Sequence, residues 1–224
     1  MKLNQTLAGL LTVAALSFCA LEARAQGGLA LGAKIGTLGP GLEMTAYITE
    51  HVNIRGGFNW IEFSWDSEVD DIEYDMDVQF ESIAALVDIH PYANNFRITG
   101  GILWNNNEAD LDGTIDEPTE IGGTTYTPAQ IGTLTGTATF DDVAPYIGIG
   151  FGNAVMDDVD LTFSFDLGVM FQGAADVTLE SDGALASDPQ FQADLAEEEE
   201  DAQDVADDLT IYPVLAFGMA YYFW

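Results

Sequence analysis

The side chains most able to do chemistry are a few cations that stand among many acids. The chain of 224 residues holds 5 Lys and Arg against 38 Asp and Glu, a formal net charge of −33. Alternation along apparent strands places Lys34, Arg55 and Arg97 opposite the apolar stripe of their strands. The same inward face is predicted for further polar side chains: Glu43, Tyr47, Asp88, Tyr146, Asp160 and Asp166.

These inward charges predict ion pairs inside a narrow barrel, because a buried charge must be paired. Arg55 and Glu43 lie on neighbouring expected strands and are the first candidate pair. Two interpretations stay open. The pairs are structural, or they leave a file of polar groups along which small solutes pass.

Catalytic and metal-binding patterns are weak in this sequence. His51 and His90 fall near predicted short turns, far apart in the chain, and neither a nucleophile elbow nor a phosphate-binding loop is present. Ser164 and Asp166 share one face of a strand, but no inward histidine is expected to complete a triad. We therefore expect no enzyme, no cofactor and no dedicated metal site.

Most acids fall in three segments between expected strands, over residues 66–77, 108–120 and 176–208. The acidic residues expected at the barrel mouth are Asp66, Glu68, Asp70, Asp71, Asp75 and Asp77. As a calcium loop this spacing is poor, since Asp71 stands where glycine is required. The acids either attract divalent cations and cationic solutes, or hydrate the surface in a saline habitat. Nucleic acid is not an expected partner, because it needs a basic footprint.

The elements that would position these side chains are eight strands. They are expected over residues 28–36, 41–50, 52–65, 78–90, 96–105, 143–151, 159–172 and 215–224. Connections after the second, fourth and sixth strands are short, and those after the third, fifth and seventh are long. This rhythm predicts an all-β fold, an eight-stranded antiparallel transmembrane up-and-down β-barrel with long acidic outer loops. A soluble sandwich, which also alternates, is the competing architecture.

Both ends of the chain indicate export to an outer membrane. Residues 1–25 have the basic start, apolar core and Ala-Arg-Ala site of a signal peptide, which leaves residues 26–224 as the barrel. The last strand closes with aromatics, and Tyr221, Phe223 and Trp224 are the expected assembly signal. The expected partners are outer-membrane lipid, lipopolysaccharide and the barrel-assembly machinery.

The last long segment carries a helix signal. Asp188 followed by Pro189 is typical of an N-cap and first helical position, and apolar residues then recur at helical spacing as far as Leu209. We expect a short amphipathic helix over the barrel mouth, with a disordered acidic tether as the alternative.

Three further runs carry a resemblance to a known family. They are Phe63-Ser64-Trp65-Asp66 followed by Tyr74-Asp75-Met76-Asp77, then Val143-Ala144-Pro145-Tyr146-Ile147-Gly148-Ile149-Gly150-Phe151, and the closing Tyr222-Phe223-Trp224. In these runs, strand order and loop rhythm, the chain resembles the CarO family of outer-membrane proteins. The resemblance implies an eight-stranded barrel linked to uptake of small, often basic, amino acids such as ornithine, and to passage of carbapenems. The extreme acidity of this chain departs from that family.

The expected function is a narrow channel for passive uptake of small solutes, favouring cationic ones such as basic amino acids. The alternative is a non-conducting structural or surface-interaction barrel, whose acidic loops bind cations or hydrate the surface.

Overall fold

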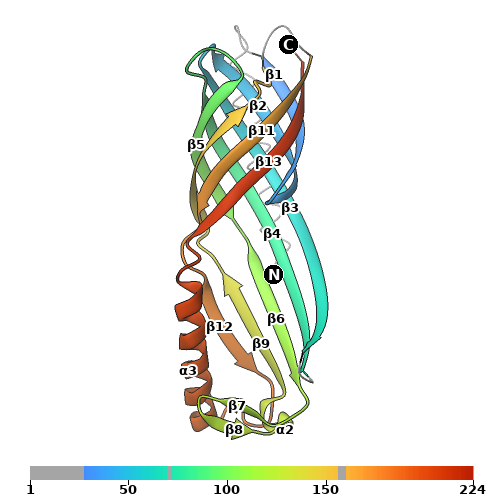
Figure 1. Cartoon of the computed structure of the whole chain (residues 1–224), viewed down its shortest axis with the longest axis vertical. Coiled ribbons are helices and arrows are strands. Elements are labelled where there is room, and N and C mark those ends of the chain that lie inside the picture. Colours follow the sequence, from blue (N-terminus) through green and yellow to red (C-terminus); the bar gives the residue numbers. More distant parts are fainter. Residues whose placement is uncertain (1–27, 70–71, 156–159, 224) are drawn as a thin grey trace.

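Eight antiparallel strands close into a barrel in the computed structural model, which describes residues 28–69, 72–155 and 160–223. The barrel strands are β1 (Leu29–Gly36), β2 (Gly39–Thr49), β3 (Val52–Val69), β4 (Ile72–Ile89), β5 (Phe96–Asn105), β10 (Val143–Phe151), β11 (Leu161–Phe171) and β13 (Ile211–Tyr222). Each pairs with its neighbour in this order, and β1 pairs with β13 to close the ring (Figure 1). The predicted barrel and its eight strands are therefore confirmed.

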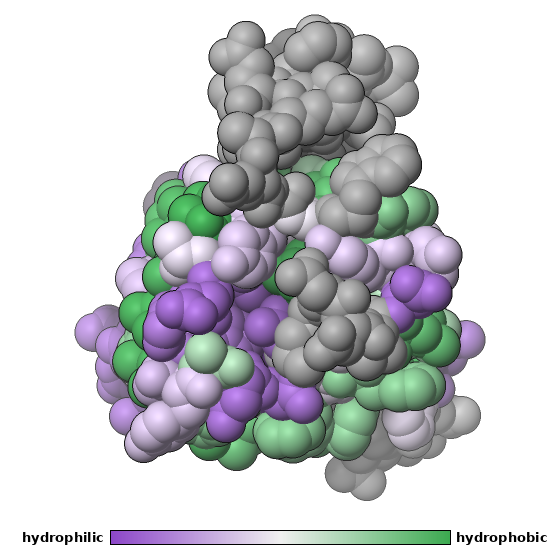
Figure 2. Space-filling view, turned by 90° about the horizontal axis from the view of Figure 1, so that it is seen from above, coloured by the Kyte–Doolittle hydropathy of each residue, from purple (hydrophilic) through white to green (hydrophobic). Residues whose placement is uncertain are grey.

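The barrel is apolar outside, and its interior holds many buried polar side chains. Large apolar side chains on its outer surface are exposed along every strand, as in Leu161, Phe163, Leu167 and Phe171 of β11. Buried polar side chains point the other way. Figure 2 views the molecule from above, at the end of the barrel opposite the extension described below, and in the coloured surface hydrophilic residues gather centrally inside an apolar edge. This is the polarity of a barrel that hydrocarbon surrounds.

A sheet extends beyond one end of the barrel. β3 and β4 continue as one uninterrupted antiparallel pair to Val69 and Ile72. The sheet is widened by β6 (Glu108–Ile115), β9 (Thr133–Thr139) and β12 (Asp176–Ser181), in the order β12-β9-β6-β4-β3. The prediction of an acidic mouth loop over residues 66–77 is therefore wrong. Asp66, Glu68, Asp75 and Asp77 lie on paired strands, which also rules out a calcium loop there.

The far tip of this extension has a small core of its own. It is formed by β7 (Thr119–Ile121), β8 (Thr124–Tyr126), α2 (Pro128–Ile131) and α3 (Pro189–Ala206) (Figure 1). Phe191 and Leu195 of α3 pack there with Ile131 and Tyr126, and the Phe191 and Tyr126 rings meet edge to face at 4.9 Å. None of the helices in the described residues is long and apolar enough to cross a membrane.

Helix α3 begins as the sequence indicates. The Asp188 carboxylate accepts hydrogen bonds from the backbone N–H groups of Gln190 and Phe191, and Pro189 occupies the first turn. Its expected position is wrong, however, because α3 lies along the edge strand β12 and contacts β7, rather than covering the barrel mouth.

The side-chain pattern of β3 and β4 inverts between barrel and extension. Inward-facing Tyr212 of β13 stacks on Phe80, which stacks on Phe63, so Phe63 continues the lumen-side face. On that face Trp65 pairs in register with Met76. The opposite face, apolar in the barrel, carries Asp66, Asp75 and Asp112 in one cross-strand row. The extension is thus apolar inside and acidic outside, which is the polarity of a sheet in water.

Several boundaries differ from the expected ones. The first turn is Thr37–Leu38, and Gly39, with a φ of +85°, already belongs to β2. β13 begins at Ile211 rather than Leu215. The expected signal peptide and Trp224 lie outside the described residues.

Candidate functional site

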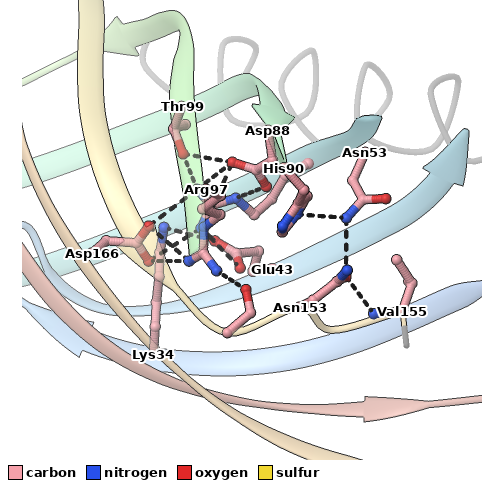
Figure 3. Close-up of polar contacts among 12 residues, drawn as sticks. Lys34, Glu43, Asn53, Asp88, His90, Arg97, Thr99, Asn153, Val155 and Asp166 are labelled. Carbon is pink, nitrogen blue, oxygen red and sulfur yellow. Dashed lines mark hydrogen bonds and ion pairs between the residues drawn. The ribbon is translucent and has the colours of Figure 1, made fainter. Parts of the chain in front are cut away.

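Six charged side chains form one layer across the barrel interior, which we call the charge layer (Figure 3). Six different strands contribute to it, and its members are Lys34 (β1), Glu43 (β2), Arg55 (β3), Asp88 (β4), Arg97 (β5) and Asp166 (β11). Because side chains alternate along a strand, each of these positions faces the lumen. The sequence predicted all six as inward.

Arg55 is the centre of the charge layer. Its Nη1 lies 3.2 Å from Glu43 Oε2, so the predicted ion pair is present, and 3.2 Å from Asp166 Oδ2. Its Nη2 donates to Asp88 Oδ1 at 3.0 Å. The Nε lies 3.0 Å from Asp88 Oδ2, an ion-pair contact whose angle does not make a hydrogen bond. One buried guanidinium therefore joins three carboxylates.

Arg97 holds the same carboxylate from the other side. Its Nη2 lies 2.8 Å from both Asp166 oxygens, and its Nη1 donates to the carbonyl of Gly152. Thr99, the next residue after Arg97 on β5 that faces the lumen, donates to Asp88 Oδ1 at 2.6 Å. Lys34 completes the layer with an ion pair of 3.2 Å to Glu43. Charge-assisted contacts of this kind fix each side chain in one orientation.

The charge layer is balanced. It contains three cations and three carboxylates, and its three cations are the only Lys and Arg residues that follow the expected signal peptide. Every acid elsewhere in the described residues therefore lacks a Lys or Arg partner among those same residues.

Glycines in the run from Val143 to Phe151 make room for this interior. Gly150 faces both Arg97 and Asp166 in register, and a Cβ there would lie 2.8 Å from Arg97 Nε and 2.9 Å from Asp166 Oδ1. Gly148 and Gly168 leave space for the Tyr146 ring, which lies buried inside the barrel. The most specific part of the family resemblance is thus a packing requirement of the lumen.

An apolar layer fills the lumen on the side of the charge layer nearer the extension. Its buried members are Leu38, Ala84, Leu86, Leu103, Ala144, Tyr146, Met170 and Val214. Of these residues the sequence predicted only Tyr146 as inward, because β4 and β5 carry apolar residues on both faces, which gives alternation little contrast at Leu86 and Leu103.

A neutral polar layer lies on the other side of the charge layer. His90 Nδ1 lies 2.7 Å from the Asn94 carbonyl, which can only accept, so this nitrogen carries the proton and Nε2 accepts from Asn53 at 3.1 Å. Asn53 also donates to Asn153 at 3.1 Å. Asn53 lies two residues before Arg55 on β3 and so shares its inward face, which was the sequence signal for Asn53, whereas Asn153 follows β10.

Two small cavities lie beside the charge layer, and Arg55 lines both of them, together with Asp166 in one and Asp88 in the other. One lies beside Tyr146 and Leu103, and the other beside His90 and Asn153. Each offers about 20 Å³ to the centre of a water-sized sphere. That volume is enough for a water molecule.

Some predicted site residues lie elsewhere. Asp160 is wrong as a lumen residue, since it sits exposed on a bend before β11. Tyr47 is half-buried near the end of β2 and outside the charge layer. Asp66, Asp75 and Asp77 are exposed on the extension, while Asp70 and Asp71 lie outside the described residues. Tyr221 and Phe223 are exposed on the barrel exterior, with ring centroids 5.2 Å apart.

A catalytic dyad is not assembled. Ser164 and His90 line the same small cavity, but Asn53 and Asn94 occupy both ring nitrogens of His90, and the two arginines hold Asp166. In the part of the chain that the structure describes, three or more His, Cys, Asp or Glu nowhere gather in a metal-binding group.

Solved structures share this architecture. The chain matches CarO2 of Acinetobacter baumannii with a TM-score of 0.57 and 21% identity, over 88% of this chain and 98% of that one. CarO of the same organism matches with a TM-score of 0.55 and 21% identity, over 87% and 97% of the two chains. A major outer membrane protein from Thermus thermophilus matches with a TM-score of 0.39 and 14% identity, over 88% and 100%.

Comparisons of sequence found nothing further, since neither a scan against protein-family models nor a search of curated proteins gave a match. The likeness to the two Acinetobacter baumannii proteins carries the fold, which agrees with the expected resemblance. The chain is a closed, eight-stranded antiparallel β-barrel whose fold is similar to those of the two Acinetobacter baumannii proteins.

Proposed function

We propose that this chain is an outer-membrane barrel with a closed lumen, which holds an acidic sheet out from the cell surface for interaction with other molecules. The observation that carries the proposal is the charge layer, in which three cations and three carboxylates pair across the interior. The apolar layer lies on one side of the charge layer and the amide layer on the other, and the two cavities beside the charge layer are each only about the size of a water molecule.

Closure has an energetic basis. A solute passing the charge layer must separate Arg55 from at least one of three carboxylates, and a buried charge left without its partner costs about 3–5 kcal/mol. The solute must also displace Tyr146 and Leu103 from the apolar layer. A row of separate, partly hydrated polar sites along the lumen would instead favour conduction.

The surroundings of the barrel follow from the same proposal. Outer-membrane lipid would cover the exposed apolar belt, and lipopolysaccharide would face the acidic extension through bridging divalent cations, because both surfaces are anionic. The leader would be cleaved near Ala25. Barrel-assembly machinery would read the closing aromatics Tyr221, Phe223 and Trp224.

A second candidate function is the narrow channel for small cationic solutes, such as basic amino acids, that the resemblance implies. One observation favours it: Arg55 lines both cavities, so a rearrangement of the charge layer around Arg55 would bring them toward each other. The acids of the extension would then concentrate cations at the entrance.

Solute flux separates the two candidates. The mature chain is refolded into liposomes, folding is checked by heat-modifiable migration on a gel, and entry of ornithine, lysine, glutamate and an uncharged solute of similar size is compared. The closed barrel predicts entry no faster than into empty liposomes for all four. Faster entry of ornithine and lysine would refute closure and establish the channel.

Two variants refine that result. Glu43→Gln and Arg55→Gln each unbalance the charge layer, whereas Asp160→Asn changes an exposed acid outside it. If the wild-type barrel conducts, a role for the Arg55–Glu43 pair requires the first two variants to alter rate or selectivity while the third does not.

A further inference from the structure

The extension has an open strand edge. β2 accompanies β3 only as far as the Gly41–Asn59 pair, whereas β4 accompanies it to Val69. Within the described residues, the side of β3 opposite β4 therefore has no neighbouring strand from Glu62 onward. Exposed edges of this kind are templates for pairing with another chain.

The other edge of the same sheet is covered. On β12, the N–H groups of Val177 and Leu179 donate to Gln203 and Glu199 of α3, at 3.0 and 2.9 Å. The chain thus caps one edge of the extension with a helix and leaves the β3 edge uncapped (Figure 1).

The backbone groups that face the open edge can be assigned. Glu81 donates its N–H to Asn107 Oδ1 and accepts at its carbonyl from Asn106, so both groups point away from β3. Glu81 faces Trp60 in register, which makes this a non-hydrogen-bonded pair of the ladder. Because the pattern repeats every second residue, Glu62, Ser64 and Asp66 also point their N–H and C=O groups to the open edge.

The two faces beside this edge differ sharply. On the inner face, Phe63 and Trp65 are 46% and 69% exposed, and Met76 and Leu111 continue the apolar strip. On the outer face lie Glu62 and Asp66 of β3, followed by further acids on β4 and β6. An apolar strip outside the lipid belt indicates a surface that another molecule covers.

Charge restricts what that molecule is. No Lys, Arg or His occurs in the sequence between Arg55 and His90, or anywhere after Arg97. A second copy of this chain would therefore set acids against acids along the outer face, and cross-strand like charges are unfavourable. A partner with basic residues on that face would be attracted instead.

We propose that the open edge of β3 binds an extended peptide in which apolar and basic side chains alternate. The peptide adds as a strand, with its backbone paired to Glu62, Ser64 and Asp66, its apolar side chains beside Phe63 and Trp65, and its basic side chains beside the acids. The inference rests on the proposed function, in that it names the partner of the surface that the closed barrel presents.

The first test uses a fluorescent synthetic peptide of about ten residues, alternating Val and Lys, matched to a typical strand length. Its anisotropy is measured with the full-length mature protein refolded in uncharged detergent micelles, and with protein-free micelles. We expect saturable binding that weakens with added salt. The alternating Val and Glu peptide should not bind, and equal binding of both peptides would overturn the proposal.

Variants at one position test the edge itself. Ser64→Pro removes an N–H that points to the open edge, whereas Ser64→Ala keeps it. Because that N–H does not pair with β4, the proline leaves the hydrogen bonds between β3 and β4 in place. We expect binding about tenfold weaker or more for Ser64→Pro, corresponding to about 1.4 kcal/mol, and unchanged for Ser64→Ala. Undiminished binding by a folded Ser64→Pro protein overturns the proposal.

A measurement on the unaltered protein covers the case in which Ser64→Pro does not fold. A Val and Lys peptide with alternate backbone amides N-methylated cannot pair along one edge, so it should lose binding, and equal binding overturns strand addition. Concentration-dependent self-association of the protein through this edge would overturn the choice of partner. None of these readouts depends on solute flux, so failure here is distinguishable from failure of the closed-lumen proposal.

Discussion

Replacing Asp166 by Asn should destabilise the barrel by about 3–5 kcal/mol, the usual cost of removing one partner from a buried ion pair. The Asp166 carboxylate receives Arg97 Nη2 at 2.8 Å on both oxygens, and Arg55 at 3.2 and 3.3 Å. At 2.8 Å and an effective dielectric constant of about 20, one such attraction is on the order of 6 kcal/mol before hydration is counted. Asn removes the charge and leaves three cations facing two carboxylates. Asp88, 3.7 Å from Arg97, compensates in part.

The assay is urea unfolding of the refolded barrel in lipid vesicles, followed by tryptophan fluorescence and by heat-modifiable migration. Asp160→Asn is the matched control, because Asp160 is exposed and outside the charge layer, so its effect should stay within about 0.5 kcal/mol. The double variant Asp166→Asn with Arg97→Met restores balance at two cations and two carboxylates. It should therefore be more stable than the sum of the single effects predicts, which a double-mutant cycle measures.

An Asp166→Asn protein as stable as the Asp160→Asn control would refute the reasoning. It would mean that water reaches the charge layer freely and screens it, in conflict with the burial of its side chains.

Three further outcomes are expected. Gly150→Ala should cost about 1–3 kcal/mol in the same assay, because its Cβ would press on the paired charges, whereas Gly100→Ala, whose Cβ would meet only the Tyr146 carbonyl oxygen at 4.0 Å, should be nearly neutral. Lost hydration and the facing carboxylates raise the pKa of Asp75. Its contribution to stability is therefore present below its ordinary pKa of about 4 and is lost as pH rises through the raised value. Asp75→Asn should accordingly raise the urea midpoint of the extension at pH 7. The hydrogen bond from Tyr126 lowers the pKa of Asp194, so the pH dependence of stability has the opposite sign. This contribution is present above about pH 4 and is lost as pH falls through the lowered value. Tyr126→Phe should therefore lower the urea midpoint at neutral pH.

The barrel strands could be predicted from the sequence because apolar and polar residues alternate along them. One face of each strand lies outside the barrel and the other lies inside it. Lys34, Arg55 and Arg97 could be placed inward for the same reason. Their partners were harder to assign, since Arg55 and Asp166 lie 111 residues apart and meet only because the barrel closes across its interior. Glu43, on the strand next to Arg55, was the partner that local reasoning could reach.

The extension was missed for a physical reason. The dense acids of residues 66–77 were interpreted as a loop, although Tyr74 and Met76 alternate with Glu73, Asp75 and Asp77 in that segment. Strands tolerate such density when one face is fully hydrated and the other is apolar. The interior apolar layer was missed because residues such as Leu86 and Val87 give no polarity contrast between faces.

The inversion of polarity along β3 and β4 has a consequence for how deeply the protein sits in its membrane. On the outer face, Trp60 and Ile83 end the apolar half of these strands, and Glu62 and Glu81 begin the acidic half. Sliding the barrel deeper would bring carboxylates into hydrocarbon, and raising it would expose the aromatic belt to water. Shifting either strand by one residue would exchange faces in both halves at once. β3 and β4 therefore determine both the depth of the barrel in the membrane and the register of the strands. The height of the acidic extension above the lipid is thus fixed by strands of the barrel wall itself.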